Sequence, residues 1–337
     1  MEILNRITQF CTLLSMAALL TNCHSSSDAN QEPPAAVITR KVSLPTIPSA
    51  SGIEKVNDRY YIIGDDSPYL FCLNEAFEVT QKILLLDSDA VVNGRIPKPV
   101  KPDLEAMTQV NLEGDPYLLI MGSGSMSTRN TAYLIPITPK GAGKPKSVSL
   151  VELYGKLSAD KNIIGQATLN IEGLGADEEY LYLLQRYAPG GQNVLITYTI
   201  SSIESFLLGK APGPKPTTVQ AWALPDIARI KTGFSGVAPA LGGKLLFTAS
   251  AEETPNAVLD GEVYGSMVGW LLAHPHPSAK PATPEVVVPI TEKGGGAYKS
   301  KIESICITNQ HRHNLTAVAV ADNDDGFSEL IVLEFNW

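Results

Sequence analysis

The stretch NIEGLGADEEYLYLLQRY, residues 170–187, decides how this chain folds. In it an apolar Ile171 precedes a lone carboxylate, Glu172, and a later aromatic and apolar run ends in the polar pair Gln185 and Arg186. Aromatic and branched side chains favour extended strands, and the small and acidic residues between the two runs are typical of a turn. The stretch therefore predicts two antiparallel strands, with a carboxylate at the start of the first and polar side chains at the end of the second.

The same pattern recurs at intervals of about 50 to 70 residues, a period typical of β-propellers built from repeated four-stranded blades. In each copy one position corresponds to the lone carboxylate. The five corresponding residues are Glu54, Glu105, Glu172, Ser235 and Glu303. Five copies of one unit predict five blades.

The last copy contains one expected strand fewer than the others, because the chain ends after strands at 302–307, 315–321 and 328–335. An isolated strand at 36–44 precedes the first copy. If it completes the last blade, it closes the ring and removes an open sheet edge. We therefore predict an all-β fold: a five-bladed β-propeller of four-stranded antiparallel blades, closed by an N-terminal strand, in a single domain over residues 36–337.

The N-terminal region predicts export and lipid attachment. Residues 10–20 form an apolar segment too short for a permanent membrane-spanning helix, and Cys23 follows shortly after it. The arrangement resembles a bacterial lipoprotein signal peptide, residues 1–22, with Cys23 as the lipidated residue; the alternatives are an ordinary signal peptide and a short core helix. The polar residues 23–35 would then be a tether to the bacterial cell envelope, on its periplasmic or surface face.

The composition bounds the class of protein. The chain has 337 residues, of which 44% are hydrophobic, so it can bury a sizeable core. Its formal net charge is −9, and it contains no concentrated run of Lys or Arg, which argues against nucleic-acid binding. Apart from the membrane reached through its lipid anchor, we expect a monomer whose partner is a small anionic molecule, a glycan or a protein.

The five repeated positions are expected to meet. The first strand of a propeller blade lines the central channel, so residues at the starts of these strands lie at one mouth. Four carboxylates at close range cannot all stay ionised without a proton or a cation. Oxygen ligands without His or Cys favour a hard cation, and calcium fits best. The alternative is that the glutamates accept hydrogen bonds from backbone N–H groups of neighbouring blades.

These motifs resemble those of the calcium-activated nucleotidases (apyrases), a five-bladed family, and the resemblance implies a channel calcium ion held by glutamates and one serine. It rests on the following residues: Ile53-Glu54 with YYIIGDD at 60–66, Leu104-Glu105-Ala106, Ile171-Glu172 with Leu184-Gln185-Arg186, Gly233-Phe234-Ser235 with LLFTASAEE at 245–253, and Glu303. The Arg-Thr-Gly that follows Asp-Asp in that family is replaced here by Ser67-Pro68-Tyr69, so its phosphate-contacting Arg is missing. The Glu172-Gly173-Leu174 segment also resembles uncharacterised phytase-like bacterial propeller lipoproteins.

Two classes of function fit such a site. The first is a cell-envelope lipoprotein that binds a cation in its channel and a ligand or partner at the mouth, without turnover. The second is a calcium-dependent hydrolase of a phosphate ester or anhydride, in which the metal polarises a phosphoryl oxygen. An esterase or lactonase using the same metal, and a glycosidase with a carboxylate pair, are further alternatives.

Polar residues at the ends of the second strands supply the predicted remainder of the site. Asp65, Asp66 or Glu253 would act as general base. Arg186 and Arg129 would hold an anionic substrate, because a guanidinium matches phosphate oxygens bidentately. Two further polar residues at these strand ends are predicted substrate contacts, Ser123 and Gln185.

Overall fold

The computed structural model describes residues 32–337, except 88, 255–260, 276–277, 279 and 323–326. Residues 34–337 form one compact unit, and all the strands of the described residues lie in it. The predicted signal peptide and Cys23 lie outside the described residues. Within the described ranges, no helix is long and apolar enough to cross a membrane.

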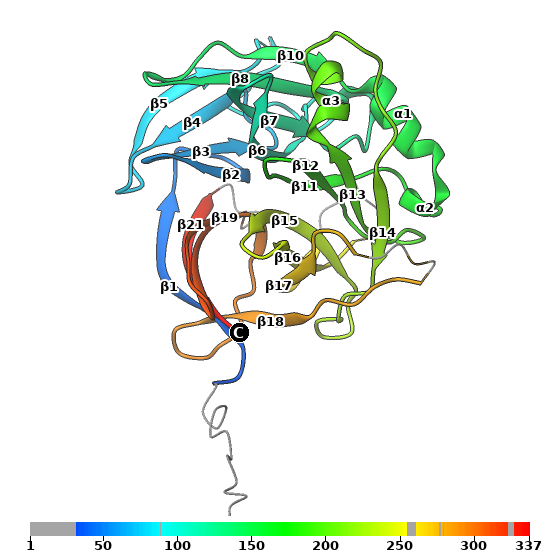
Figure 1. The fold of residues 1–337 in the computed structure, drawn as a ribbon. Helices are drawn as coiled ribbons and strands as arrows, with labels where there is room; N and C mark the ends of the chain where they lie inside the picture. The colour runs from blue at the N-terminus through cyan, green and yellow to red at the C-terminus, as the bar shows by residue number, and fades with distance from the viewer. Residues whose placement is uncertain (1–31, 88, 255–260, 276–277, 279, 323–326) are drawn as a thin grey trace, which may run out of the picture. The chain divides into compact units, whose positions relative to one another are not determined.

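Three antiparallel sheets each contain one consecutive group of strands (Figure 1). The first group is β2 (Ala50–Val56), β3 (Arg59–Gly64), β4 (Tyr69–Leu73) and β5 (Val79–Leu84). The second is β6 (Leu104–Leu112), β7 (Asp115–Gly122), β8 (Thr131–Thr138) and β10 (Lys146–Ser149), with the short β9 (Gly141–Ala142) paired to β8. The third is β11 (Ile171–Ala176), β12 (Tyr180–Gln185), β13 (Asn193–Thr199) and β14 (Thr218–Trp222).

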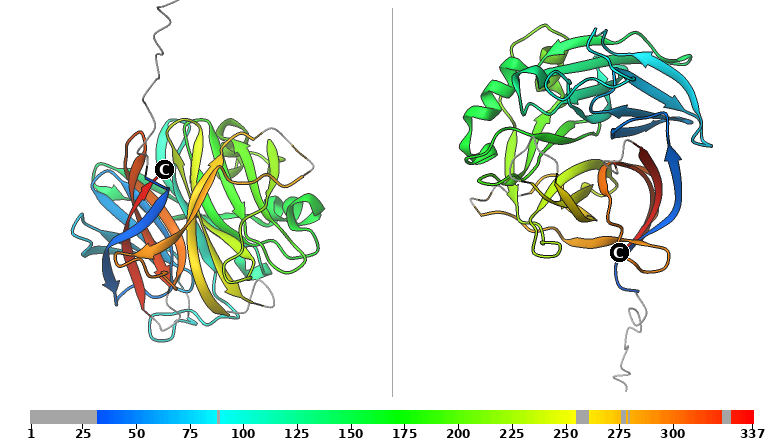
Figure 2. Two further views of the ribbon diagram at one scale, coloured as in Figure 1. Left: turned by 90° about the horizontal axis from the view of Figure 1, so that it is seen from below. Right: turned by 180° about the vertical axis from the view of Figure 1, so that it is seen from behind.

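An 8-stranded sheet contains the remaining two groups. The fourth group is β15 (Thr232–Ala240), β16 (Lys244–Glu253), β17 (Glu262–Leu272) and β18 (Val286–Glu292). The fifth is β19 (Lys301–Gln310), β20 (Asn314–Asp322), β21 (Ser328–Asn336) and the N-terminal β1 (Ala35–Leu44). β1 pairs antiparallel with β21 along its whole length, as the strand count in the sequence predicts. It also pairs in parallel with β18 through Ala36–Ile38, which the sequence did not predict and which joins the two groups (Figure 2).

The first strands of the groups, β2, β6, β11, β15 and β19, are called the inner strands here. Each contacts the inner strand of the next group, and β19 contacts β2, so that the contacts form a closed cycle. Apolar clusters fill the space between consecutive groups. Between the fifth and the first group, for example, Val318 and Leu330 pack with Ile62 and Phe71. The core thus lies between sheets, and the starts of the inner strands face a common centre.

Every inner strand has a β-bulge near its start. In the pairing with its neighbour the extra residue is Ser51 in β2, Glu105 in β6, Glu172 in β11 and Glu303 in β19. In β15 the irregularity falls between Phe234 and Val237 and therefore includes Ser235. A bulge interrupts the regular alternation of side chains and re-aims one of them. It is this feature that turns one polar side chain per inner strand away from the apolar core.

Helices are few and cover the outer strands. After the second group the chain forms α1 (Val151–Ala159) and α2 (Lys161–Ile164), and a short 3₁₀ helix, η1 (Ser127–Arg129), precedes β8. The sequence did not predict α3 (Ile200–Leu207), because its first residue continues the β-rich run of β13. Its buried residues are Ile200, Ile203, Phe206 and Leu207, a spacing that places them on one helical face.

Candidate metal centre and ligand cavity

A cavity of about 650 Å³ lies where the inner strands β2, β6, β11 and β19 begin. Charged side chains dominate its lining, and carboxylates outnumber cations. The acidic residues are Asp65, Asp66, Asp103, Glu105, Glu172, Glu252, Glu303 and Asp322. The basic residues are Arg95, Lys98, Lys101, Arg129, Arg186 and Lys301. Such a lining favours ion pairs within the cavity, and the excess carboxylates favour a bound proton or cation.

Glu105, Glu172 and Glu303 form the centre of this site and are called the glutamate triad below. They come from three different inner strands, and one carboxylate oxygen of each lies within 4.8 Å of the others. Glu172 Oε1 accepts a hydrogen bond of 2.7 Å from Asn170 Nδ2. Glu303 Oε2 is buried and has no hydrogen-bond partner among the described residues. The triad therefore contains an oxygen that is ready to coordinate a further group.

The protonation equilibria of the triad reflect this crowding. Burial and the neighbouring Glu172 raise the pKa of Glu105 well above its ordinary range. Burial, only partly opposed by Lys301 and reinforced by Glu172, raises the pKa of Glu303 to about 8. Glu105 and Glu303 thus resist ionising in this site, and a cation placed among the carboxylates would remove that resistance.

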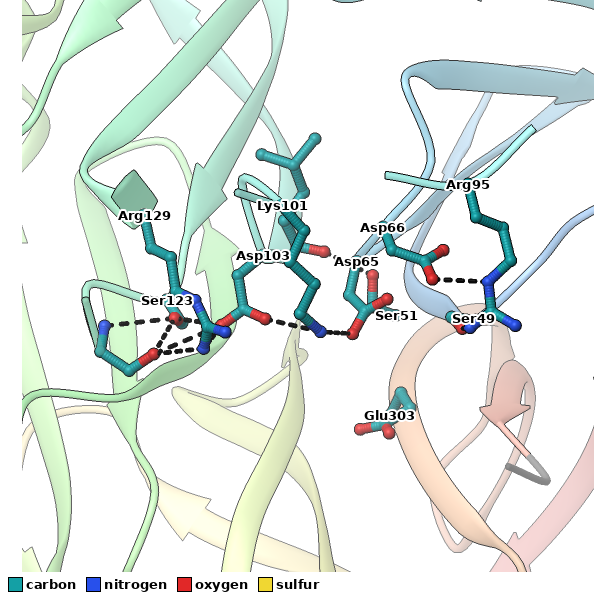
Figure 3. A network of polar contacts seen from close by, with 12 residues as sticks. Ser49, Ser51, Asp65, Asp66, Arg95, Lys101, Asp103, Ser123, Arg129 and Glu303 are labelled. Atoms are coloured by element: carbon teal, nitrogen blue, oxygen red, sulfur yellow. Dashed lines mark hydrogen bonds and ion pairs between the residues drawn. The ribbon is translucent and has the colours of Figure 1, made fainter. Parts of the chain in front are cut away.

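A second acidic group, Asp65, Asp103 and Glu105, already contains a cation from the protein. Figure 3 shows the Lys101 ammonium between Asp103 and Asp65. Lys101 Nζ pairs with Asp65 and lies 2.8 Å from Asp103 Oδ1. Lys301 Nζ, by contrast, contacts one triad member, Glu303 Oε1 at 3.0 Å, and its other carboxylate contact, at 3.6 Å, is Glu252 Oε2 outside the triad. The triad is therefore the better candidate metal centre.

Glu54 does not join the triad, and this corrects the prediction made for the first repeat. The bulge of β2 falls on Ser51, three residues earlier, so Ser51 is the equivalent of Glu105. The Glu54 carboxylate instead accepts hydrogen bonds from the backbone N–H groups of Gln109, at 3.1 Å, and Lys55, at 3.0 Å. It lines a separate cavity of about 310 Å³. The alternative predicted for the glutamates, a hydrogen bond to the neighbouring inner strand, describes Glu54.

The structure reveals a five-residue motif that the sequence prediction aligned incorrectly. Its third position is the bulge residue, its second and fifth are apolar, and its fourth is small. The five copies are SASGI (49–53), DLEAM (103–107), NIEGL (170–174), GFSGV (233–237) and KIESI (301–305). The fourth residue is small because the next inner strand approaches closely: a Cβ on Gly173 would lie 2.5 Å from Ser235 O. This motif is the signal that could have identified Ser51.

The first position of the motif supplies site residues that the sequence prediction missed. It contains Ser49, Asp103, Asn170 and Lys301, all of which line the cavity. The fourth copy has Gly233 there, and a Cβ on Gly233 would lie 2.6 Å from Arg186 Cγ. Asp103 has φ 52, a conformation that Asp tolerates better than most residues. The residue at the first position of the motif thus faces the cavity or, like Gly233, leaves room for a side chain that does.

The predicted serine of the metal set, Ser235, is buried beside the site. Its hydroxyl lies 2.9 Å from Thr248 Oγ1, and it is not part of the cavity lining. Neither Ser235 nor Glu54 therefore joins the three glutamates that the structure brings together.

Three of the four residues predicted as catalytic line the cavity. Asp66 receives a 2.6 Å bond from Arg95 Nε, and Asp65 is paired with Lys101. Burial lowers the pKa of Arg186, but Glu172 and other carboxylates outweigh it and hold this pKa above its ordinary value. The fourth, Glu253, is exposed, accepts a hydrogen bond from Tyr264 Oη at 3.1 Å, and lies outside the cavity lining.

The three predicted substrate contacts have different surroundings. Gln185 is fully buried, accepts a bond from Asn170 N at 2.8 Å and donates one to Arg186 O at 2.8 Å, so it stabilises the strand ends. Ser123 is also fully buried and donates to Asp103, which it positions. Only Arg129 lines the cavity itself.

Comparison with known families supplies an assignment for the chain. Residues 46–335 match the profile of a family described as a family of unknown function, DUF6929. The chain belongs to DUF6929. The matched region includes all five copies of the motif and every residue of the cavity lining. No curated protein matches this DUF6929 chain.

Solved structures similar to the DUF6929 chain include several enzymes. A glutaminyl cyclase of Myxococcus xanthus is 12% identical with a TM-score of 0.49, covering 90% of this chain and 99% of that one. An arabinanase of Bacillus subtilis is 13% identical with a TM-score of 0.44, covering 86% and 94%. The catalytic domain of an α-L-arabinofuranosidase of Coprinopsis cinerea is 11% identical with a TM-score of 0.46, covering 89% and 96%. The function of the DUF6929 chain is accordingly argued from its own residues.

Proposed function

We propose that this DUF6929 protein is a five-bladed β-propeller that binds a divalent cation within the glutamate triad and a small ligand in the cavity beside it. The five blades would be the five strand groups, whose inner strands contact one another in a cycle. The observation that carries the proposal is the convergence of three carboxylates from three inner strands, one of them with a buried oxygen without a partner among the described residues.

Calcium is the favoured ion. The triad offers only oxygen ligands, which select hard cations over zinc or copper. Calcium accepts six to eight oxygens in flexible geometry, so three carboxylates, in monodentate or bidentate contact, and water molecules from the cavity can complete its shell. Magnesium demands a stricter octahedron and holds its water tightly. A site assembled from three separate sheet groups fits the more tolerant ion.

The test compares triad variants with a matched control. We expect calcium to raise the melting temperature of the wild-type protein and to give a binding isotherm by calorimetry, since a ligand at 100 times its Kd stabilises by about 2.7 kcal/mol. Glu172→Gln and Glu303→Gln should lose both effects. Glu54→Gln, which removes a buried glutamate on an inner strand outside the triad, should keep them. Equal calcium binding by wild type and both triad variants would overturn the proposal.

Hydrolysis is the second candidate, and Asp65 is the residue that favours it. Burial, only partly opposed by Lys101 and reinforced by Asp66, raises the pKa of Asp65 to about 6. Its Oδ1 is buried without a hydrogen-bond partner among the described residues. A carboxylate with a pKa near neutrality beside a cation could take a proton from an attacking water.

A substrate screen separates this candidate from simple binding. Nucleoside diphosphates, phytate and p-nitrophenyl esters would be incubated with the calcium-loaded protein and with protein treated with a chelator. Hydrolysis would require calcium, and Asp65→Asn should abolish it while leaving calcium binding intact. Absence of turnover with all three substrate classes would leave the protein as a binding protein.

The cellular setting is also a proposal. We place the protein on the bacterial cell envelope through a lipid on Cys23, as a monomer without affinity for nucleic acid, because the sequence up to Cys23 resembles a lipoprotein signal. Expression of the full chain should give a membrane-associated product whose N-terminal peptide has the mass of a lipidated cysteine. Cys23→Ser should release it to the soluble fraction; an unchanged distribution would contradict the anchor.

A further inference from the structure

One edge of the Arg129 guanidinium has no partner in the described structure. Its Nη1 donates to Asp103 Oδ2 and to Ser125 Oγ, each at 2.7 Å. Its Nε and Nη2 are buried and form no hydrogen bond to any described residue. The side chain is 2% exposed and lines the cavity. A buried charged donor without an acceptor costs free energy, so we expect these two N–H groups to bind an acceptor that a ligand supplies.

The geometry of the orphan pair specifies the kind of acceptor. Nε and Nη2 lie on the same edge of the planar guanidinium, and such an edge binds two oxygens of one oxyanion in parallel. A single carbonyl or water would satisfy only one of the two N–H groups. The unpartnered edge of Arg129 therefore matches a carboxylate or a phosphate better than a neutral ligand.

Neighbouring carboxylates are already committed to other donors. Asp103 accepts from Arg129 and Ser123 on Oδ2 and pairs with Lys101 on Oδ1 (Figure 3). Two cations thus share this one carboxylate. Asp65 pairs with Lys101 rather than with Arg129. Neither carboxylate therefore accepts a hydrogen bond from the Nε–Nη2 edge of Arg129.

The backbone holds Arg129 in place before any ligand arrives. Arg129 N donates to Met126 O at 3.0 Å, and Gly124 N donates to Arg129 O at 3.1 Å. A Cβ on Gly122 would lie 2.6 Å from Arg129 O, so the loop packs tightly on the end of β7. Tyr154 Oη in α1 donates to Gly122 O at 2.6 Å and fixes that end. A donor pair positioned in this way loses little entropy on binding.

We propose that the Nε–Nη2 edge of Arg129 binds the carboxylate of a small ligand that occupies the cavity. A carboxylate is planar, as the edge is, and carries one charge. A phosphate monoester carries nearly two, and the excess of acidic over basic residues in the lining disfavours it. This inference rests on the proposed function for its cavity, because the same space would hold the cation at the glutamate triad; it adds the chemical class of the ligand.

The binding experiment uses the protein with acetate and inorganic phosphate as probes, each with calcium and with chelator. We expect acetate to bind the wild-type protein more tightly than phosphate, and Arg129→Lys to weaken acetate binding at least tenfold, because lysine keeps the charge but lacks the two parallel N–H donors. Arg59→Lys, which changes an arginine outside the cavity, is the matched control and should bind as wild type. Equal acetate affinity in wild type and Arg129→Lys overturns the inference, and tighter binding of phosphate overturns the assignment to carboxylate.

A second measurement does not depend on the variant retaining its fold. In a nitrogen–proton spectrum of the wild-type protein, the Arg129 Nε–Hε signal, assigned by its loss in Arg129→Lys or Arg129→Gln, should shift on addition of acetate. An unmoved signal at saturating acetate refutes the contact. Calcium binding without acetate binding would refute this inference alone, whereas acetate binding without calcium binding would refute the metal proposal alone.

Discussion

Glu54 and Glu303 both lie on inner strands, but they differ in their surroundings and therefore in their roles. Glu54 accepts two backbone N–H groups, one of them from Gln109 on the neighbouring β6, and thereby joins two inner strands. Glu303 faces two other carboxylates and retains an oxygen without a partner among the described residues. The number of fixed donors around a buried carboxylate separates a structural glutamate from a candidate ligand.

Glu54 also makes the stability of the protein depend on pH. Burial, only partly opposed by the N–H groups of Gln109 and Lys55, raises its pKa from 4.5 to about 7. The folded protein therefore holds this proton more tightly than the unfolded chain. The stability that the protonated Glu54 carboxyl contributes is fully present below pH 4.5 and is lost as the pH rises through 7. We expect the free energy of unfolding of the wild type, relative to Glu54→Gln, to fall by roughly 1–3 kcal/mol between pH 4.5 and about 8.

Urea unfolding of the two proteins at both pH values measures this effect. The comparison with Glu54→Gln removes the titration of all other groups, which the two proteins share. An unchanged difference between wild type and variant across this range would show that the Glu54 carboxyl titrates normally in the folded protein.

Sequence reasoning at this scale identified the triad but missed its neighbours. Glu105, Glu172 and Glu303 were found because a lone carboxylate before a small residue stands out in an apolar strand. Lys101 and Asp103 did not stand out, since Lys and Asp before a strand are common, and only the folded chain shows that they face the same cavity. A single ion pair such as Lys101 with Asp103 has no signature in the spacing of residues.

At the scale of the element, the inner strand is the unit that builds the site. In four of the five inner strands the bulge turns one polar residue toward the cavity, and the small fourth motif position lets the next inner strand approach. The strands themselves were predictable from their aromatic and branched residues. The bulge was not, because it depends on the pairing register, and a shift of three residues in the first copy exchanged Ser51 for Glu54.

The close approach of inner strands predicts the effect of one added methyl group. A Cβ on Gly173 would lie 2.5 Å from Ser235 O on the neighbouring strand, a contact with backbone that cannot rotate away. We expect Gly173→Ala to destabilise the protein by about 1–3 kcal/mol, as overpacking does, and to weaken calcium binding because Glu172 is adjacent. Thermal unfolding and calcium titration of the variant check both effects.

Gly155→Ala is the matched control for this substitution. Gly155 lies inside α1, and a Cβ there would meet no atom within 4 Å. Alanine favours a helix over glycine, so we expect this variant to be more stable than wild type by about 0.5–1 kcal/mol. If both glycine variants change stability in the same direction, the close approach at Gly173 does not limit the size of that side chain.

At the scale of the whole molecule, the two ends of the chain complete one strand group. Counting strands in the sequence predicted that an N-terminal strand would pair with the last one, because three strands at the C-terminus and one at the N-terminus make a group of four. The parallel pairing of β1 with β18 could not be predicted in this way, since it involves only Ala36–Ile38 and follows from the meeting of the fourth and fifth groups. β1 thus joins parts of the chain that are about 250 to 300 residues away from it.

Removal of β1 tests this closure. A chain that starts at Thr46 lacks the partner of β21 and the link to β18, so it exposes the backbone of β21 as an open sheet edge, which favours association between copies. We expect this protein to melt at a lower temperature than a chain that starts at Pro34, to show a broader transition, and to elute as aggregates on size exclusion. The chain from Pro34 retains all the pairing of β1 and should behave as a chain that starts at Cys23 does. If the two truncated chains melt alike, β1 is an accessory strand, and the contacts among the inner strands alone hold the cycle closed.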